Sequence, residues 1–206
     1  MQIDCATAAA PNFCAFCGGA LSYRGPAGAW ACVACEKVTY VGPTVLVLSL
    51  IFAEERILLM KRGLPPCVGT WVPPGGFVEL NESLEAAAAR ETAEEVGIVL
   101  EPAQLVPHAI VSLPAINQIY CCFLTVLDRM QTPRACLPEA LDACWFTQDD
   151  YPSAAMWVMP TGFEIAEIFR QVRTGQFRFY QRTGELVRSF GPLTRTHFED
   201  ALVGCR

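Results

Sequence analysis

The chain of 206 residues has no run of basic residues, no long uninterrupted apolar segment and only two histidines. Its formal net charge is −6, from 15 Lys and Arg against 21 Asp and Glu. A surface that follows a nucleic-acid backbone needs clustered positive charge, so we expect no nucleic-acid partner. Charges, prolines or glycines interrupt every apolar run well short of the roughly 18 residues of a membrane helix, so we expect no membrane partner either.

The amino terminus also lacks the features of a secretory leader, because no basic segment precedes an apolar one in Met1–Cys5. Eleven cysteines are present. An odd number of cysteines in a chain of this size, without a recognisable leader, favours reduced thiols over disulfides. We therefore expect a cytoplasmic protein.

Two Cys-x-x-Cys pairs stand fourteen residues apart near the amino terminus: Cys14 and Cys17, then Cys32 and Cys35. Each pair can form a turn that presents two thiolates, and four thiolates complete a tetrahedral zinc site, which is closed and structural. Two disulfides or four free thiols are the alternatives. Nucleic-acid binding by such a zinc ribbon is disfavoured, because the segment carries only Arg24 and Lys37 as cations.

Near Tyr40 the segment with the two Cys-x-x-Cys pairs ends and long apolar runs begin. We therefore predict a zinc ribbon with its tail over 1–39 and a second domain over 40–206. Apolar runs and alternation predict strands at 44–53, 57–61, 98–105, 108–111, 119–127 and 143–146, a short strand before the first helix, and a hairpin of 176–180 and 186–190. A second helix is expected to start at Pro160-Thr161, with Phe163 among its core residues. Strands with a helix on each side indicate an α/β/α sandwich with a mixed sheet.

The first helix is expected after Ser83, a favourable N-cap, and before Gly97, a favourable left-handed C-cap. Helical periodicity predicts one apolar stripe against the sheet: Ala86, Ala89, Ala93 and Val96. The same periodicity places three acids together on the opposite side: Glu91, Glu94 and Glu95. Their mutual repulsion and the negative end of the helix dipole both oppose this arrangement. We therefore predict a site for a divalent cation, magnesium or manganese, which prefers clustered oxygen ligands.

The spacing of these residues resembles the signature of the Nudix hydrolases. The matching positions are Gly76, Glu82, Arg90-Glu91, Glu94-Glu95 and Gly97-Ile98. One position departs from the pattern, because Thr92 stands where the family prefers an aliphatic residue. The resemblance implies the α/β/α fold and magnesium-dependent hydrolysis of a diphosphate linkage.

The resemblance also implies roles for individual residues. Glu91, Glu94 and Glu95 would hold the metals, joined by the backbone carbonyl of Gly75. In this family the pair that corresponds to Glu82 and Arg90 orients the first metal-binding glutamate, here Glu91.

A further carboxylate from a downstream loop usually serves as the base or as an extra ligand in this family. Glu139 is our candidate and Asp142 the second, although both could be ordinary surface acids.

The order of a zinc ribbon and a Nudix domain is similar to that of zinc-ribbon Nudix hydrolases, which include plant plastid FAD and ADP-ribose diphosphatases. The segment 112–120 and the aromatic hairpin around 177–180 support this likeness. It implies hydrolysis of ADP-ribose or FAD to release AMP, and a homodimer. NADH is the alternative substrate, although the Ser-Gln-Pro-Trp-Pro-Phe-Pro motif of NADH pyrophosphatases is absent from this sequence.

Substrate contacts are less well defined by the sequence. Arg62 could contact a phosphate, and Trp71, Tyr120 or Phe123 could stack on a base, with Gln118 beside them on the same strand as the last two. The alternative is that the arginine is solvated and the rings belong to the core. A sensor that binds ADP-ribose without cleaving it is also considered, but such a protein is expected to lose metal-binding acids, and all of them are present here.

Overall fold

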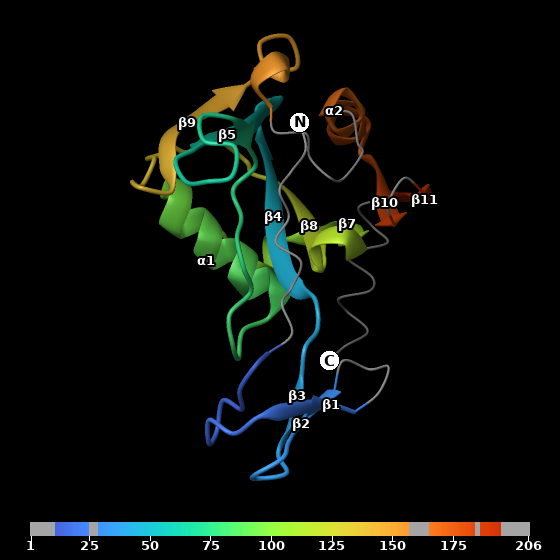
Figure 1. Cartoon of the computed structure of the whole chain (residues 1–206). Coiled ribbons are helices and arrows are strands. Elements are labelled where there is room, and N and C mark those ends of the chain that lie inside the picture. The colour runs from blue at the N-terminus through green and yellow to red at the C-terminus, as the bar shows by residue number, and fades with distance from the viewer. Residues whose placement is uncertain (1–10, 25–28, 157–164, 184–185, 195–206) are drawn as a thin grey trace. The chain divides into compact units, whose positions relative to one another are not determined.

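The computed structural model describes residues 11–24, 29–156, 165–183 and 186–194 (Figure 1). The chain divides into two compact units. The smaller contains Met1–Thr44 together with Leu113–Gln118, and the larger contains Val45–Ser112 and Ile119–Arg206. No feature of the sequence predicted that Leu113–Gln118 would group with the cysteine-rich region.

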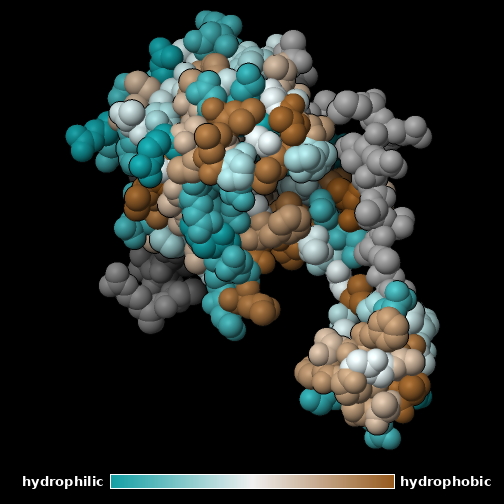
Figure 2. Space-filling model, turned by 60° about the vertical axis from the view of Figure 1, so that its left-hand side comes forward, coloured by the Kyte–Doolittle hydropathy of each residue, from teal (hydrophilic) through white to brown (hydrophobic). Residues whose placement is uncertain are grey.

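The smaller unit is a three-stranded antiparallel sheet in the order β1-β2-β3, formed by Leu21–Tyr23, Ala29–Cys32 and Val38–Tyr40. Among its described residues, the buried apolar side chains are Cys14, Ala31 and Cys32. Large apolar side chains are exposed instead: Phe13, Phe16, Tyr23, Val33, Val38 and Tyr40. Figure 2 shows tan and brown residues over much of this unit. So small a core cannot stabilise these strands by apolar burial alone.

The larger unit is built on a mixed sheet with strand order β11-β10-β7-β8-β4-β5-β6, and β9 pairs with β5. The strands are β4 (Thr44–Ala53), β5 (Arg56–Arg62), β6 (Trp71–Val72), β7 (Val106–Leu113), β8 (Gln118–Val126), β9 (Ala140–Phe146), β10 (Gln176–Thr183) and β11 (Leu186–Thr194). Strand β10 runs parallel to β7, whereas β5 is antiparallel to β4, β6 and β9.

Two helices, α1 (Leu84–Val96) and α2 (Ile165–Thr174), cover opposite faces of this sheet (Figure 1). Strand β4 shows the two faces: Val47 and Ile51 pack in the core cluster with α1, and Leu50 and Phe52 pack in the cluster with α2. The predicted α/β/α sandwich is therefore confirmed. No helix within the described residues has both the length and the apolar character to cross a membrane.

Two of the predicted elements are wrong. No strand forms over 98–105, where the chain instead makes a short 3-10 helix, Pro102–Gln104, capped by hydrogen bonds between Glu101 and Gln104. Proline favours the first turn of a helix and cannot donate to a strand ladder, which explains the difference. The short strand expected before α1 is only an isolated bridge between Leu46 and Phe77. The predicted helix start at Pro160-Thr161, with Phe163, lies outside the described residues, and α2 is described from Ile165.

Histidine 108 on β7 predicts a pH dependence of stability. Its side chain is 2% exposed, its ring centroid lies 5.4 Å from that of Tyr180, and burial lowers its pKa to about 4. An unfolded histidine has a pKa of about 6.5, so as the pH falls from 7 to 4 the unfolded chain takes up a proton that the folded chain resists. This residue alone should lower the free energy of unfolding by up to about 3 kcal/mol over that range.

Urea denaturation at a series of pH values tests this, with His108→Leu as the comparison. All other titrating groups are shared by the two proteins, so the variant should lose less stability between pH 7 and pH 4. Equal losses in the two proteins would contradict the assignment.

Candidate active site

Helix α1 carries the candidate site, and its ends are the predicted ones. Ser83 Oγ accepts a hydrogen bond from Ala86 N at 3.1 Å, and Gly97 ends the helix in a left-handed conformation with φ 68°. The helix is rotated relative to the prediction, however. Of the predicted stripe only Val96 is fully buried; the buried residues are Ala87, Ala88, Thr92, Glu95 and Val96.

Thr92, the departure from the family pattern, lies in the interior with no exposed surface. Its hydroxyl donates to Ala88 O at 2.7 Å and lies 3.1 Å from Ser49 Oγ on β4. A buried hydroxyl is costly only when it lacks a hydrogen-bond partner. The threonine therefore fits the helix–sheet interface without disrupting it.

Glu95, predicted on the side of the helix opposite the apolar stripe, is buried, with 5% of its surface exposed. Its Oε2 accepts a hydrogen bond from Gly75 N at 2.7 Å. Burial raises its pKa to about 8, and the charges of Glu91 and Glu139 act in the same direction. A raised pKa means that the charged form of Glu95 is disfavoured at neutral pH. A bound cation would stabilise that charged form.

Glu91, one helical turn earlier, is half-buried against the turn before the helix. Burial raises its pKa, although Arg90 partly offsets this. A β-carbon at Gly76 would lie 2.5 Å from the Glu91 carboxylate, so a glycine is required there for the two to approach. Glu94 is the exposed member of the trio, with a side-chain exposure of 55%.

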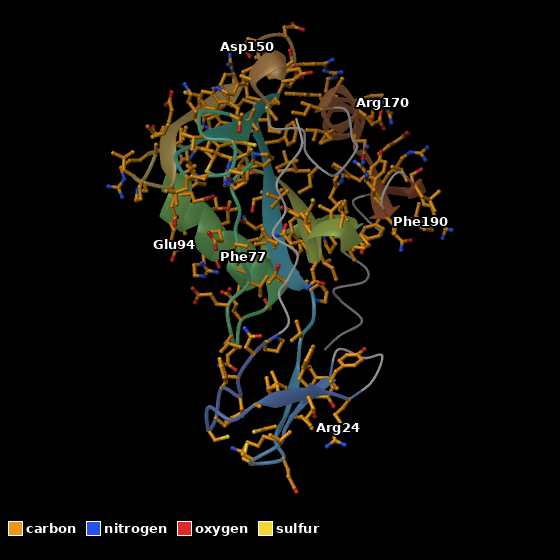
Figure 3. All side chains as sticks on the ribbon, in the orientation of Figure 1. Arg24, Phe77, Glu94, Asp150, Arg170 and Phe190 are labelled. Carbon is orange, nitrogen blue, oxygen red and sulfur yellow. The ribbon has the colours of Figure 1, made fainter. Side chains whose placement is uncertain are left out.

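Arg90 connects the acids of this region into one network. It donates from Nη2 and Nε to Glu82 at 2.7 and 3.1 Å, and from Nη1 to Glu91 and Glu94 at 3.0 Å each. It also donates to Phe77 O at 3.1 Å. Figure 3 labels the side chains of Phe77 and Glu94. The hydrogen bonds from Arg90 lower the pKa of Glu82. The predicted pair of Glu82 and Arg90 therefore touches Glu91, as an orienting pair must.

The donor set fits magnesium or manganese, because Glu91, Glu94 and Glu95 offer hard carboxylate oxygens beside the Gly75-Gly76 turn. Two of these acids have raised pKa values, and Arg90 donates hydrogen bonds to Glu91 and Glu94. Within that same part of the chain, no three carboxylates approach each other within 4.8 Å.

The charge of Glu139, immediately before β9, contributes to the raised pKa of both Glu91 and Glu95. Asp142 lies opposite Lys61 in the β5–β9 ladder, and its Oδ1 accepts a hydrogen bond from Ala143 N at 2.8 Å. These charge interactions favour Glu139 over Asp142 as the candidate for the additional carboxylate.

The residues predicted to contact the substrate lie in different environments. Arg62 lowers the pKa of Glu95, and its Nε donates to Pro66 O at 3.0 Å. Trp71 packs edge-to-face on Phe146 at 4.9 Å beside the core cluster of α2. Tyr120 and Phe123 are 4% and 2% exposed, so neither offers an open face for a base, which corrects the prediction. Gln118 is half-buried and groups with the smaller unit.

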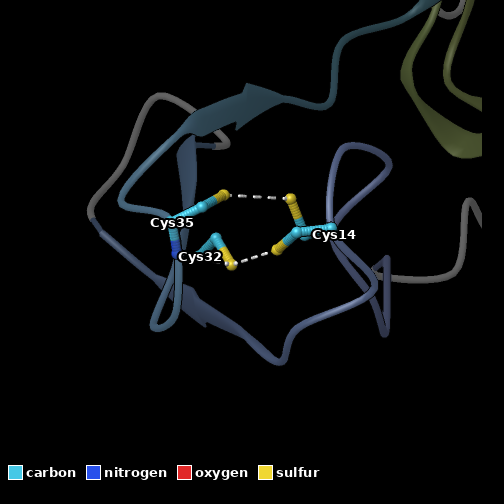
Figure 4. A group of neighbouring side chains, drawn as sticks. Cys14, Cys32 and Cys35 are labelled. Carbon is cyan, nitrogen blue, oxygen red and sulfur yellow. Dashed lines mark hydrogen bonds between the residues drawn. The ribbon is translucent and has the colours of Figure 1, made fainter.

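The four cysteines of the smaller unit converge on one point (Figure 4). All four sulfur atoms lie within 4.8 Å of one another, with Cys14 and Cys35 at 3.7 Å and Cys17 and Cys32 at 3.5 Å. A tetrahedral zinc with Zn–S bonds of about 2.3 Å separates its sulfurs by about 3.8 Å, so the cluster fits zinc. Backbone N–H groups of Cys35 and Ala34 lower the pKa of Cys32 to about 6, which favours the thiolate.

Residues 42–164 match the family model for the NUDIX domain. The match spans more than half of the chain, and the described fold and acidic helix agree with it. The chain belongs to the Nudix hydrolase family.

Individual relatives are similar over different lengths. An ADP-ribose pyrophosphatase of Methanocaldococcus jannaschii is 43% identical over 60 residues, which are 29% of this chain and 36% of that protein. The NAD-capped RNA hydrolase NudC of Salmonella heidelberg is 29% identical over 144 residues, 68% of this chain and 53% of that protein. The chain thus spans from about a third to about half the length of these curated relatives.

A solved structure supports the fold over most of the chain. The NUDIX hydrolase from Nitrosomonas europaea superposes with a TM-score of 0.71 at 30% identity, over 84% of this chain and 98% of that one.

Proposed function

We propose that this chain is a magnesium- or manganese-dependent pyrophosphohydrolase that cleaves the diphosphate of ADP-ribose or FAD and releases AMP. The observation that carries the proposal is the burial of Glu95 and Glu91 on one helix, both with raised pKa values, against the Gly75-Gly76 turn. Buried acids of this kind are useful to a protein when a cation neutralises them.

In the proposed mechanism, the carboxylates of Glu91, Glu94 and Glu95 and the carbonyl of Gly75 would hold the metal. When bound, the metal neutralises phosphate oxygens and lowers the pKa of the attacking water. Arg90, fixed by its two hydrogen bonds to Glu82, holds Glu91 Oε1 at 3.0 Å and so sets the orientation of that carboxylate. Such an orienting pair preserves ligand geometry without touching the substrate.

Glu139 is proposed as the general base or as an additional ligand. Its side chain is exposed, unlike Glu95, so water has access to it. Its charge acts on Glu91 and Glu95, which supports a role near the proposed metal ligands. A positioned base typically contributes a factor of about 10² to 10⁴ to the rate.

A second candidate substrate is the diphosphate of NADH or of an NAD cap on RNA. The relatives named NAD-capped RNA hydrolases favour it. The four-cysteine unit is proposed to bind zinc in a structural role, as its sulfur spacing supports. A homodimer and a cytoplasmic location stay predictions from the sequence.

A substrate panel tests the ranking. ADP-ribose, FAD, NADH, an NAD-capped oligoribonucleotide, a diadenosine polyphosphate and ATP are compared at equal concentration with magnesium. We expect the highest kcat/KM for ADP-ribose or FAD, with AMP and ribose phosphate or FMN as products. A maximum for NADH or for the capped oligonucleotide would select the second candidate. A maximum for ATP would contradict both and leave only the family chemistry.

A further inference from the structure

An unusually close backbone contact joins the end of β5 to the segment that carries Glu139. Gly63 N donates to Glu139 O at 2.7 Å. A β-carbon built on Gly63 would lie 1.9 Å from Pro138 O and 3.2 Å from Glu139 O. Real β-carbons do not approach another atom within 3.0 Å, so residue 63 has no room for any side chain.

The Glu139 segment cannot simply retreat from such a side chain, because it is anchored on its other side. Ala140, which is fully buried, donates its N–H to Cys136 O at 3.0 Å. Cys136 N in turn donates to Glu95 O, near the carboxyl end of α1, at 2.9 Å. The segment is therefore tied through backbone hydrogen bonds to the helix that bears the acids.

Gly63 is also fixed from its own side. Arg62 N donates to Thr70 O at 2.9 Å and Gly69 N donates to Arg62 O at 2.8 Å, which closes the loop 63–70. The Arg62 side chain donates to Pro66 O at 3.0 Å within this loop. Neither partner of the Gly63 contact is thus free to move without breaking several hydrogen bonds.

We propose that Gly63 is a positioning residue for Glu139. Its lack of a side chain lets Pro138 and Glu139 lie against the end of β5, and this contact fixes the backbone from which the Glu139 side chain projects. The inference rests on the catalytic role proposed above for Glu139. A methyl group at residue 63 would force a backbone displacement of about 1 Å, and a misplacement of that size can cost about a hundredfold in rate.

Four variants test the inference: Gly63→Ala, Glu139→Gln, the double variant, and Gly42→Ala. Gly42 is the matched control, because a β-carbon there meets nothing within 4 Å. The readout is kcat and KM for AMP release from ADP-ribose, with folded content checked by circular dichroism and melting.

We expect Glu139→Gln to lower kcat by about a hundredfold or more. Gly63→Ala should lower kcat at least about tenfold with KM changed less than about threefold, because the loss lies in positioning rather than in binding. The double variant should show no loss beyond Glu139→Gln, and Gly42→Ala should stay within about twofold of wild type. This non-additivity distinguishes positioning of Glu139 from a general structural defect.

The other outcomes distinguish the proposed role of Glu139 from the positioning role of Gly63. Wild-type turnover of Glu139→Gln would overturn the proposed role of Glu139 and, with it, the inference. Loss of activity in Glu139→Gln with wild-type turnover in Gly63→Ala would overturn the inference alone, as would an equal loss from Gly63→Ala in both backgrounds. Should Gly63→Ala fail to fold, Pro138→Gly replaces it, since glycine loosens the same segment without adding an atom at residue 63. The inference then requires that Pro138→Gly lowers kcat only when Glu139 is present; any other result overturns it.

Discussion

Replacing Glu95 by glutamine is expected to lower kcat by at least about a hundredfold. Glutamine keeps the shape of the side chain and can still accept the hydrogen bond from Gly75 N, which spans 2.7 Å in the wild type. It removes the charge that we propose holds the metal, and loss of metal-borne charge stabilisation raises the barrier to hydrolysis. Glu94→Gln is expected to lower kcat as well, since Glu94 is proposed to share the metal.

The fold should survive the Glu95 substitution. Because Glu95 is 5% exposed and its pKa is raised by burial, the neutral amide should melt at the same or a slightly higher temperature when metal is absent. Asp149→Asn is the matched control, because it removes one charge from an exposed turn after β9. Turnover is measured at saturating substrate and magnesium. Wild-type turnover in both glutamine variants would refute the metal site.

Zinc removal is expected to unfold the smaller unit. Its described residues bury little apolar surface, so its stability must come largely from metal binding. In comparable four-ligand sites the apparent binding free energy is about 10–16 kcal/mol, and this becomes the folding free energy of the segment. Protein purified without added metal should contain about one zinc per chain by elemental analysis.

Cysteine substitution provides the matched comparison for zinc. Cys32→Ser should lose the zinc and expose the three remaining thiols of the cluster to a thiol reagent. Cys67→Ser, at a partly buried cysteine outside the cluster, should retain it. Native protein without zinc, in which all four thiols titrate freely, is the result that would rule out the site.

The sequence predicted the ends of α1, but not which face of the helix is buried. The reason is the alanine content: Ala86, Ala87, Ala88 and Ala89 are consecutive, so the apolar contrast around the helix is weak. Thr92 and Glu95 are polar residue types that occupy buried positions, and periodicity therefore placed the interior on the wrong side. Burial of a charged side chain for chemistry is a property that hydrophobic patterning cannot anticipate.

The aromatic residues of β8 failed as binding candidates for a related reason. Alternation along a strand suggests that half of its side chains face solvent. Strand β8 lies inside the sheet between β7 and β4, and the helices cover both faces, so Tyr120 and Phe123 are buried together. The Gly63 contact was equally hidden, because it joins backbone atoms far apart in the chain. A glycine directly after a strand was the only local signal for it.

The central claim is that buried acids on α1 hold a divalent cation that drives diphosphate hydrolysis. The most direct measurement is AMP release from ADP-ribose by the wild-type chain as magnesium is titrated from zero after chelation. We expect no release without the metal, a rise to saturation with magnesium, and no such rise in Glu95→Gln. Equal release with and without magnesium, or an equal response in Glu95→Gln, would contradict it.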